Sequence, residues 1–181
     1  MGVLGAILVV QLRHQKEMIA IKKIRKMTYT AIISAIVAVS STIIYIPVGF
    51  ARIFPIQHLA NMLTAVLVGP YYAVAQALLS STIRNIMGMG SLFAFPGSMI
   101  GALLAGLVYS KTRNLTFTAL GEVIGTGIFG AMAAYPIAVL ILGQDATLFG
   151  LIPAFIISSF AGAAFAFFIL KILERNRVLT K

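Results

Sequence analysis

The strongest constraint on the fold of this chain is a series of long apolar runs that carry almost no charge. Of its 181 residues, 60% are hydrophobic and 10% are charged, whereas soluble domains are roughly 45–50% apolar and about 25% charged. The runs cover residues 28–46, 59–88, 95–110, 115–143 and 149–170. Because a helix needs about 20 such residues to cross a bilayer, the sequence predicts an integral membrane protein with no room for a soluble catalytic domain.

The segment 57–88 determines the number of spans, because it is long for one bilayer crossing and short for two. Its Gly69-Pro70 pair predicts a break, since Pro70 lacks a backbone donor and disfavours helix at the residue before it. Six spans place twelve of the fourteen Lys and Arg residues on the side of the termini and leave Arg52 and Arg84 outside, whereas five spans divide them seven and seven. Since Lys and Arg concentrate on the cytoplasmic side, we predict an all-α bundle of six transmembrane helices with both termini cytoplasmic. The second and third spans are expected to be short or tilted.

Small residues recur at every fourth position in several spans. They are Ala31 and Ala35; Gly97, Gly101 and Ala105; Gly121 and Gly125; and Gly130 and Ala134. This spacing places each set on one helix face, where it lets two backbones approach closely. Packing inside the bundle is the general use of such a face, and docking of a second membrane protein is the alternative. The spacing leaves both open.

Polar side chains gather at the outer ends of the second and third spans. The first group is Gln57, His58 and Asn61, and the second is Gln76, Ser80, Arg84 and Asn85. Helical spacing puts each group on one face, and polar groups are costly inside a membrane, so both are candidates for a binding site. Two other interpretations stay open: Arg84 extends its long side chain to the outer interface, or His58 bridges helices without contacting a ligand.

The fifth span carries further polar residues. Glu122 and Thr126 lie one turn apart, and Tyr135 lies further towards the outside. An ionisable group within a span is a functional candidate, but Glu122 is only about 10 Å from the cytoplasmic start of its span. Glu122 therefore either contributes to the site or holds helices together, and Tyr135 either contributes to the site or belongs to an interfacial aromatic belt.

No catalytic constellation is present in the sequence. The chain has four acidic residues, two histidines and no cysteine, with no paired-His helix, close carboxylate pair or Gly-Lys-Ser/Thr phosphate loop. We therefore expect a protein that is not an enzyme, holds no metal or cofactor and hydrolyses no ATP itself. Its net charge of +10 reflects orientation in the membrane rather than binding to nucleic acid.

Five segments, taken in this order, resemble the S components, or substrate-capturing subunits, of energy-coupling-factor (ECF) vitamin transporters. They are PIQHLAN (55–61), LVGPYYAVAQA (67–77), RN (84–85), GSLFAFPGSMIGALLAGLVY (90–109) and GEVIGTGIFGA (121–131). Within this family they are most similar to the ThiW type, which is assigned to the thiazole precursor of thiamine. The resemblance extends over about residues 22–170.

This resemblance implies a multi-pass protein of the bacterial cytoplasmic membrane whose ligand pocket near the outer face is capped by the loop 47–57. It leaves residues 1–21 as an N-terminal extension, 22–175 as a single six-helix membrane domain and 176–181 as a basic cytoplasmic tail. S components dock through an Ala-xxx-Ala face of the first span onto a membrane scaffold subunit, which two ATP-binding subunits drive. Ala31 and Ala35 match that docking pattern.

The expected function is capture of hydroxyethylthiazole or a related thiamine precursor outside the cell and its delivery to the cytoplasm. The leading pocket residues are His58, Asn61, Arg84 and Asn85, with Gln57, Thr126, Tyr135 and Glu122 as further candidates and Phe93–Pro96 as an apolar wall. A neutral thiazole needs no cation, so Arg52 and Arg84 leave an anionic relative open. Three further hypotheses also stay open: an S component for the thiamine pyrimidine, a secondary carrier that depends on Glu122, and a scaffold protein that does not transport.

Overall fold

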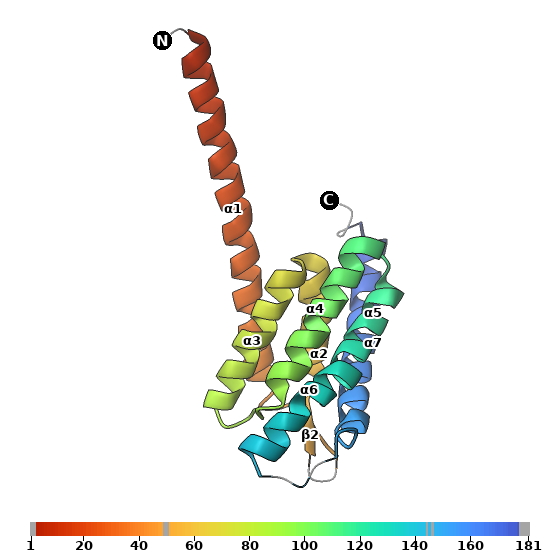
Figure 1. Ribbon diagram of the computed structural model, residues 1–181. Helices are drawn as coiled ribbons and strands as arrows, with labels where there is room; N and C mark the ends of the chain where they lie inside the picture. The colour runs from red at the N-terminus through yellow and green to blue at the C-terminus, as the bar shows by residue number, and fades with distance from the viewer. Residues whose placement is uncertain (1–2, 49–50, 144, 146, 178–181) are drawn as a thin grey trace.

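A computed structural model describes residues 3–48, 51–143, 145 and 147–177 as a bundle of helices with one short β-hairpin (Figure 1). The first part consists of α1 (Val3–Ser40), β1 (Ile46–Val48), β2 (Ala51–Ile53), α2 (Pro55–Leu67), α3 (Pro70–Ile86) and α4 (Ala94–Thr112). A long helical run follows, made of α5 (Leu115–Ile124), the π-helical turn η1 (Gly125–Gly130), α6 (Ala131–Pro136) and the π-helical turn η2 (Ile137–Ile141). The last helix is α7 (Ile152–Arg175).

The helical segments alternate in direction along the bundle. The β1–β2 hairpin, the α3–α4 connection and the segment before α7 therefore lie at one end, which we call the hairpin end (Figure 1). The first residues of α1, the last residues of α7 and the α2–α3 turn lie towards the opposite end. The functional candidates on different helices can meet only if they share an end of the bundle, so this arrangement decides which of them form a site.

The predicted break at Gly69-Pro70 is confirmed. α2 ends at Leu67 and α3 begins at Pro70. Gly69 has φ 115°, a conformation that costs glycine little, and Pro70 occupies the first turn of α3, where its missing donor is tolerated. The two helices have 13 and 17 residues, so both are shorter than the roughly 20 residues of a perpendicular bilayer crossing.

The segment before α2 differs from the expected plain loop. β1 and β2 pair as an antiparallel hairpin with Ile46 opposite Ile53, which adds two three-residue strands to the predicted all-α class. α1 ends at Ser40 rather than at residue 46. The hydroxyls of Ser41 and Thr42 donate to the carbonyls of Val37 and Val39, each at 2.7 Å. Such local side-chain bonds compete with continuation of a helix.

Three of the small-residue sets pack against each other inside the bundle. A Cβ added at Gly130 would lie 2.6 Å from the Cα of Gly97, and one added at Gly125 would lie 2.8 Å from the Cα of Gly101. Glycine at these four positions therefore lets α4 and η1 approach backbone to backbone. These sets serve internal packing, which is the general use of such faces.

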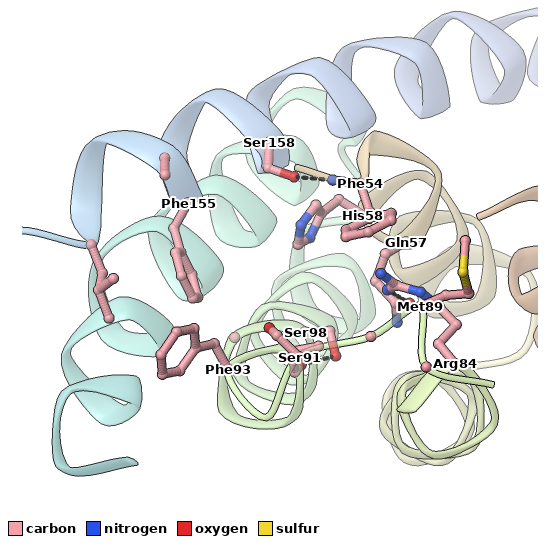
Figure 2. A pocket seen from close by; sticks show the side chains of 16 residues that line it. Phe54, Gln57, His58, Arg84, Met89, Ser91, Phe93, Ser98, Phe155 and Ser158 are labelled. Atoms are coloured by element: carbon pink, nitrogen blue, oxygen red, sulfur yellow. Dashed lines mark hydrogen bonds between the residues drawn. The ribbon is translucent and has the colours of Figure 1, made fainter. Parts of the chain in front are cut away.

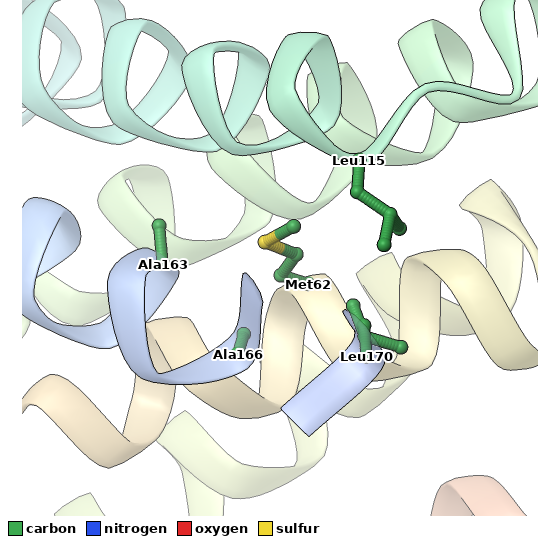
Figure 3. Close-up of a cluster of buried hydrophobic side chains, with 5 residues drawn as sticks. All are labelled: Met62, Leu115, Ala163, Ala166 and Leu170. Carbon is green, nitrogen blue, oxygen red and sulfur yellow. The ribbon is translucent and has the colours of Figure 1, made fainter. Parts of the chain in front are cut away.

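A hydrophobic cluster joins α2, α5 and α7 (Figure 3). Its buried members are Met62, Leu115, Ala163, Ala166 and Leu170. Leu115 begins α5 directly after Asn114, whose side-chain Oδ1 accepts hydrogen bonds from the backbone N–H groups of Thr116 and Phe117 at 2.8 and 3.2 Å. This cap fixes the start of α5 and so places Leu115 against α7.

α1 is the most peripheral helix. Its described side chains from Gln11 to Tyr29 are all exposed, and this half of the helix projects beyond the bundle (Figure 1). Further along, Ser34 and Val37 are buried on the side that packs on α3, whereas Ala31 and Ala35 are exposed. The proposed division at residues 21 and 22 falls within this continuous helix and stays a prediction.

Two helical stretches among the described residues are by themselves long and apolar enough to cross a membrane, Leu115–Ile141 and Ile152–Arg175. Many large apolar side chains along α7 are exposed, among them Phe160, Phe165 and Phe168. Such a surface is unfavourable in water and suits lipid.

We expect Gly130→Ala to destabilise the protein, although alanine is normally the better helix former. The new methyl group would meet the backbone of Gly97 at 2.6 Å, and such overpacking typically costs about 1–3 kcal/mol. Thermal unfolding of the purified protein in detergent would measure the change. Gly121→Ala is the milder comparison, because its new methyl group would meet a Val108 methyl carbon at 3.2 Å, the Leu104 carbonyl oxygen at 3.3 Å and the Ala105 Cα at 3.4 Å. Equal loss in both variants would contradict the specific role of the Gly97–Gly130 contact.

Candidate functional site

A cavity of about 520 Å³ opens between α2, α3, α4 and α7 at the hairpin end (Figure 2). Its volume is within the range of roughly 300–1,000 Å³ that is usual for small-molecule sites. Its polar wall residues are Gln57, His58, Arg84, Ser91, Ser98 and Ser158, and its large apolar ones are Phe54, Met89, Phe93, Leu151 and Phe155. Apolar walls with a few polar groups are typical of sites for small organic ligands.

Arg84 is the most deeply buried cation on the cavity wall, with 1% of its surface exposed. Its Nη1 donates a hydrogen bond to Oε1 of Gln57 at 3.1 Å, and Nε2 of Gln57 in turn donates to Oγ of Ser80 at 2.8 Å. The stripe of polar residues along α3 and the polar start of α2 are thus joined in one chain of hydrogen bonds. Arg84 points into the protein, so its side chain does not extend to the outer interface.

Phe54 connects this wall to the hairpin. The guanidinium carbon of Arg84 lies 3.8 Å from the centroid of the Phe54 ring, close enough for a cation–π interaction. The backbone N–H of Phe54 donates to Oγ of Ser158 on α7 at 3.2 Å. Phe54 directly follows β2 in the chain, so these two contacts fix the base of the hairpin next to the cavity.

Glu122 is the centre of a second buried network. Its Oε1 lies 3.0 Å from Nδ1 of His58, 3.0 Å from Nδ2 of Asn61 and 3.1 Å from Oγ1 of Thr126. Asn61 also donates to the carbonyl of Ser98 at 3.1 Å. A fully buried carboxylate is costly unless it is hydrogen-bonded or paired. Three groups meet this requirement at Oε1: His58 and Asn61 tie α2 to α5, and Thr126 lies one turn further along the same helical run as Glu122.

Two glycines make this network sterically possible. A Cβ at Gly101 would collide with Oγ1 of Thr126 and lie 2.9 Å from both carboxylate oxygens of Glu122. A Cβ at Gly162 would collide with the carbonyl of Pro55 and lie 2.7 Å from Cβ of His58. α4 and α7 therefore come close to the polar residues only because they present glycine there.

The eight predicted site residues divide into three groups. Gln57, His58 and Arg84 line the cavity. Asn61, Glu122 and Thr126 form the buried network directly behind His58 and do not line the cavity. Asn85 and Tyr135 lie outside both groups.

Asn85 holds the α3–α4 connection, because its Nδ2 donates to the carbonyls of Ser81 and Ser91 at 2.8 and 3.2 Å. Tyr135 is half-buried on α6 and does not line the cavity. The side chain of Arg52 lies outside the described part of the chain. Of the predicted apolar wall, Phe93 and Ala94 line the cavity.

The sequence did not single out Phe54, Met89, Phe155 or Ser158 as site residues. Phe155 is one of twelve phenylalanines, and its spacing in α7 does not distinguish it from those that face outward. A Cβ at Gly97 would lie 2.6 Å from the Phe155 ring, so the partner of this ring is a glycine on another helix. Among the described residues, no group of three His, Cys, Asp or Glu side chains is placed to hold a metal ion.

We expect Glu122→Ala to destabilise the protein by about 2–4 kcal/mol, because it leaves His58 without its buried partner and opens a void. Thermal unfolding in detergent would measure this loss. The control is Glu174→Ala, which removes an exposed pair with Lys171 at 3.0 Å and should cost about 1 kcal/mol or less. Similar stabilities of the two variants would show that Glu122 does not hold the helices together.

The comparisons with known proteins agree with the resemblance seen in the sequence. The family model described as thiamine-precursor transporter protein (ThiW) matches residues 27–176, which is well over half of the chain. No match was found among curated proteins or among solved structures. The matched range includes every residue of the cavity wall and of the Glu122 network. The chain belongs to the ThiW family of thiamine-precursor transporter proteins.

Proposed function

We propose that this protein is the substrate-capturing subunit of an ECF-type, ATP-driven importer that takes up hydroxyethylthiazole or a related thiamine precursor. The observation that carries the proposal is the cavity at the hairpin end, lined by three phenylalanines and by Gln57, His58 and Arg84. Membership of a transporter family for thiamine precursors gives the substrate class.

The chemistry of the cavity suits a small heteroaromatic ring with a polar side chain. Phe93 and Phe155 lie on one side of the cavity, while Arg84 and Gln57 lie on the other (Figure 2). Aromatic walls favour stacking or edge contacts with a ring. In the proposed complex the thiazole ring lies between the phenylalanines, and its side chain reaches the polar wall.

The proposed orientation follows from the distribution of charge. Lys and Arg residues cluster near the two termini and at Lys111 and Arg113, and the positive-inside rule assigns these positions to the cytoplasm. Six membrane crossings then put the hairpin end and its cavity at the outer face of a bacterial cytoplasmic membrane. The short α2 and α3 are accommodated by the surrounding longer helices.

The proposed partners are a membrane scaffold subunit and two ATP-binding subunits. The sequence has no nucleotide-binding loop, so in an ATP-driven importer the ATP would be hydrolysed by other chains. The exposed Ala31 and Ala35 form a small-residue face on α1, and such faces allow close helix–helix contact in lipid. We assign the scaffold contact to this face.

Gently purified protein should release hydroxyethylthiazole or a close relative, identified by mass spectrometry. Phe155→Ala should weaken binding of that compound about tenfold or more, since it removes one aromatic wall, whereas Phe165→Ala, an exposed residue on the same helix, should bind like the wild type. Release of the thiamine pyrimidine instead would assign the protein to that precursor. Equal binding by both variants would show that the ligand does not bind in this cavity.

Ala31→Trp or Ala35→Trp should abolish uptake by cells that contain the ATP-binding and scaffold subunits, yet leave ligand binding by the purified protein unchanged. Ile36→Trp is the control, because Ile36 is also exposed on α1 but lies on a neighbouring face. Loss of ligand binding in Ala31→Trp or Ala35→Trp would show that this face packs inside the protein.

A proton-coupled carrier is the second candidate, and the buried His58–Glu122 pair is the observation that favours it. Uptake in cells that lack the ATP-binding subunits, with loss in Glu122→Gln, would support this carrier and contradict the ECF proposal.

A further inference from the structure

Several buried polar atoms have no hydrogen-bond partner among the described residues. These atoms are Asn61 Oδ1, Thr64 Oγ1, Gln76 Oε1, Glu122 Oε2, and Nε and Nη2 of Arg84. Of these five residues, only Arg84 lines the cavity. Its unpaired donors are therefore the ones next to the cavity, and because both nitrogens are themselves buried, a ligand reaches them only when a neighbouring side chain shifts.

The two free nitrogens of Arg84 have a specific geometry. Nε and Nη2 form one edge of the planar guanidinium, and their N–H groups on that edge are nearly parallel. Nη1, on the other side, is already bonded to Gln57 at 3.1 Å. A pair of parallel donors on an arginine edge matches the two oxygens of a carboxylate or phosphate group. A single neutral hydroxyl would use only one of them.

The charge of Arg84 is also uncompensated. Among the described residues it forms no ion pair, and its neighbours are the neutral amide of Gln57 and the ring of Phe54. Glu122 is bonded through Oε1 to His58, Asn61 and Thr126 and does not line the cavity. A buried cation is unfavourable without a counter-charge, so the cavity favours a ligand that supplies one.

We infer that Arg84 recognises an oxyanion on the ligand through its Nε–Nη2 edge, and that the transported precursor is the anionic form, a thiazole that carries a phosphate monoester or a carboxylate. This inference rests on the proposed function and adds the charge of the substrate to it. The aromatic wall at the opposite side of the cavity holds the ring (Figure 2), and Gln57 holds the guanidinium in place.

The test compares four ligands by calorimetry on the full-length protein in lipid nanodiscs: hydroxyethylthiazole, its phosphate monoester, the analogue with a carboxymethyl side chain, and inorganic phosphate. At least one oxyanionic thiazole should bind about ten- to hundredfold more tightly than the alcohol, as expected for charge-assisted hydrogen bonds. Arg84→Gln should reduce this preference to about twofold or less. Lys111→Gln, which removes an exposed cation at the other end of α4, should keep it.

The wild-type comparison decides the inference even if Arg84→Gln fails to fold. An alcohol that binds at least as tightly as both oxyanions overturns it and leaves the proposed function intact, whereas no binding of any of the three thiazoles overturns both. Arg84→Lys, which keeps the charge and loses the parallel donors, should retain only part of the preference, and full retention would contradict recognition by the guanidinium edge. Inorganic phosphate that binds as tightly as the ester would also overturn the inference, because the ring would then contribute nothing.

Discussion

The structure depends on the need to satisfy polar groups within the protein, because lipid offers them no hydrogen bonds. Glu122 shows this most clearly, since its carboxylate is fully buried and one oxygen is shared by side chains of α2 and η1. Asn61 and Thr126 also donate to the carbonyls of Ser98 and Gly97 on α4. Together these bonds fix the register of α2, α4 and the α5–η1 run, which apolar surfaces alone would not fix because lipid competes equally for such surfaces. His58 belongs both to this network and to the cavity wall, so the network helps to hold the wall in place.

Glycine and alanine serve two different purposes in the same bundle. Gly97, Gly101, Gly125 and Gly130 bring α4 and η1 into backbone contact, and Gly101 in addition makes room for the Glu122 network. Ala31 and Ala35 have the same four-residue spacing but are exposed. Spacing is a local property and cannot tell these uses apart, whereas burial depends on which helices become neighbours. The packing therefore separates faces that build the bundle from a face that stays exposed.

The sequence predicted the features that follow from local periodicity and from backbone chemistry. The break at Gly69-Pro70 depends on two residues, and the grouping of Gln57, His58 and Asn61 depends on the pitch of one helix. The role of Glu122 was harder to predict, because its position along the span placed it far from the outer polar groups. α2 has only 13 residues, about 20 Å of helix, so its polar start lies deep enough to reach Glu122. Phe155 and Phe54 were missed because their neighbours come from distant parts of the chain.

The two charged side chains near the cavity, Glu122 and Arg84, have opposite environments, and this difference indicates a different role for each. Oε1 of Glu122 lies within hydrogen-bond distance of three side chains, and Glu122 does not line the cavity, so a ligand gains little by approaching it. Arg84 is fixed on one side by Gln57 and on its face by Phe54, yet keeps one edge without a partner among the described residues. A donor held rigidly before binding loses little entropy when the ligand arrives. The free-energy cost of burying these unpaired donors is therefore offset when a ligand bonds to them. A ligand that brings a negative charge offsets this cost most fully.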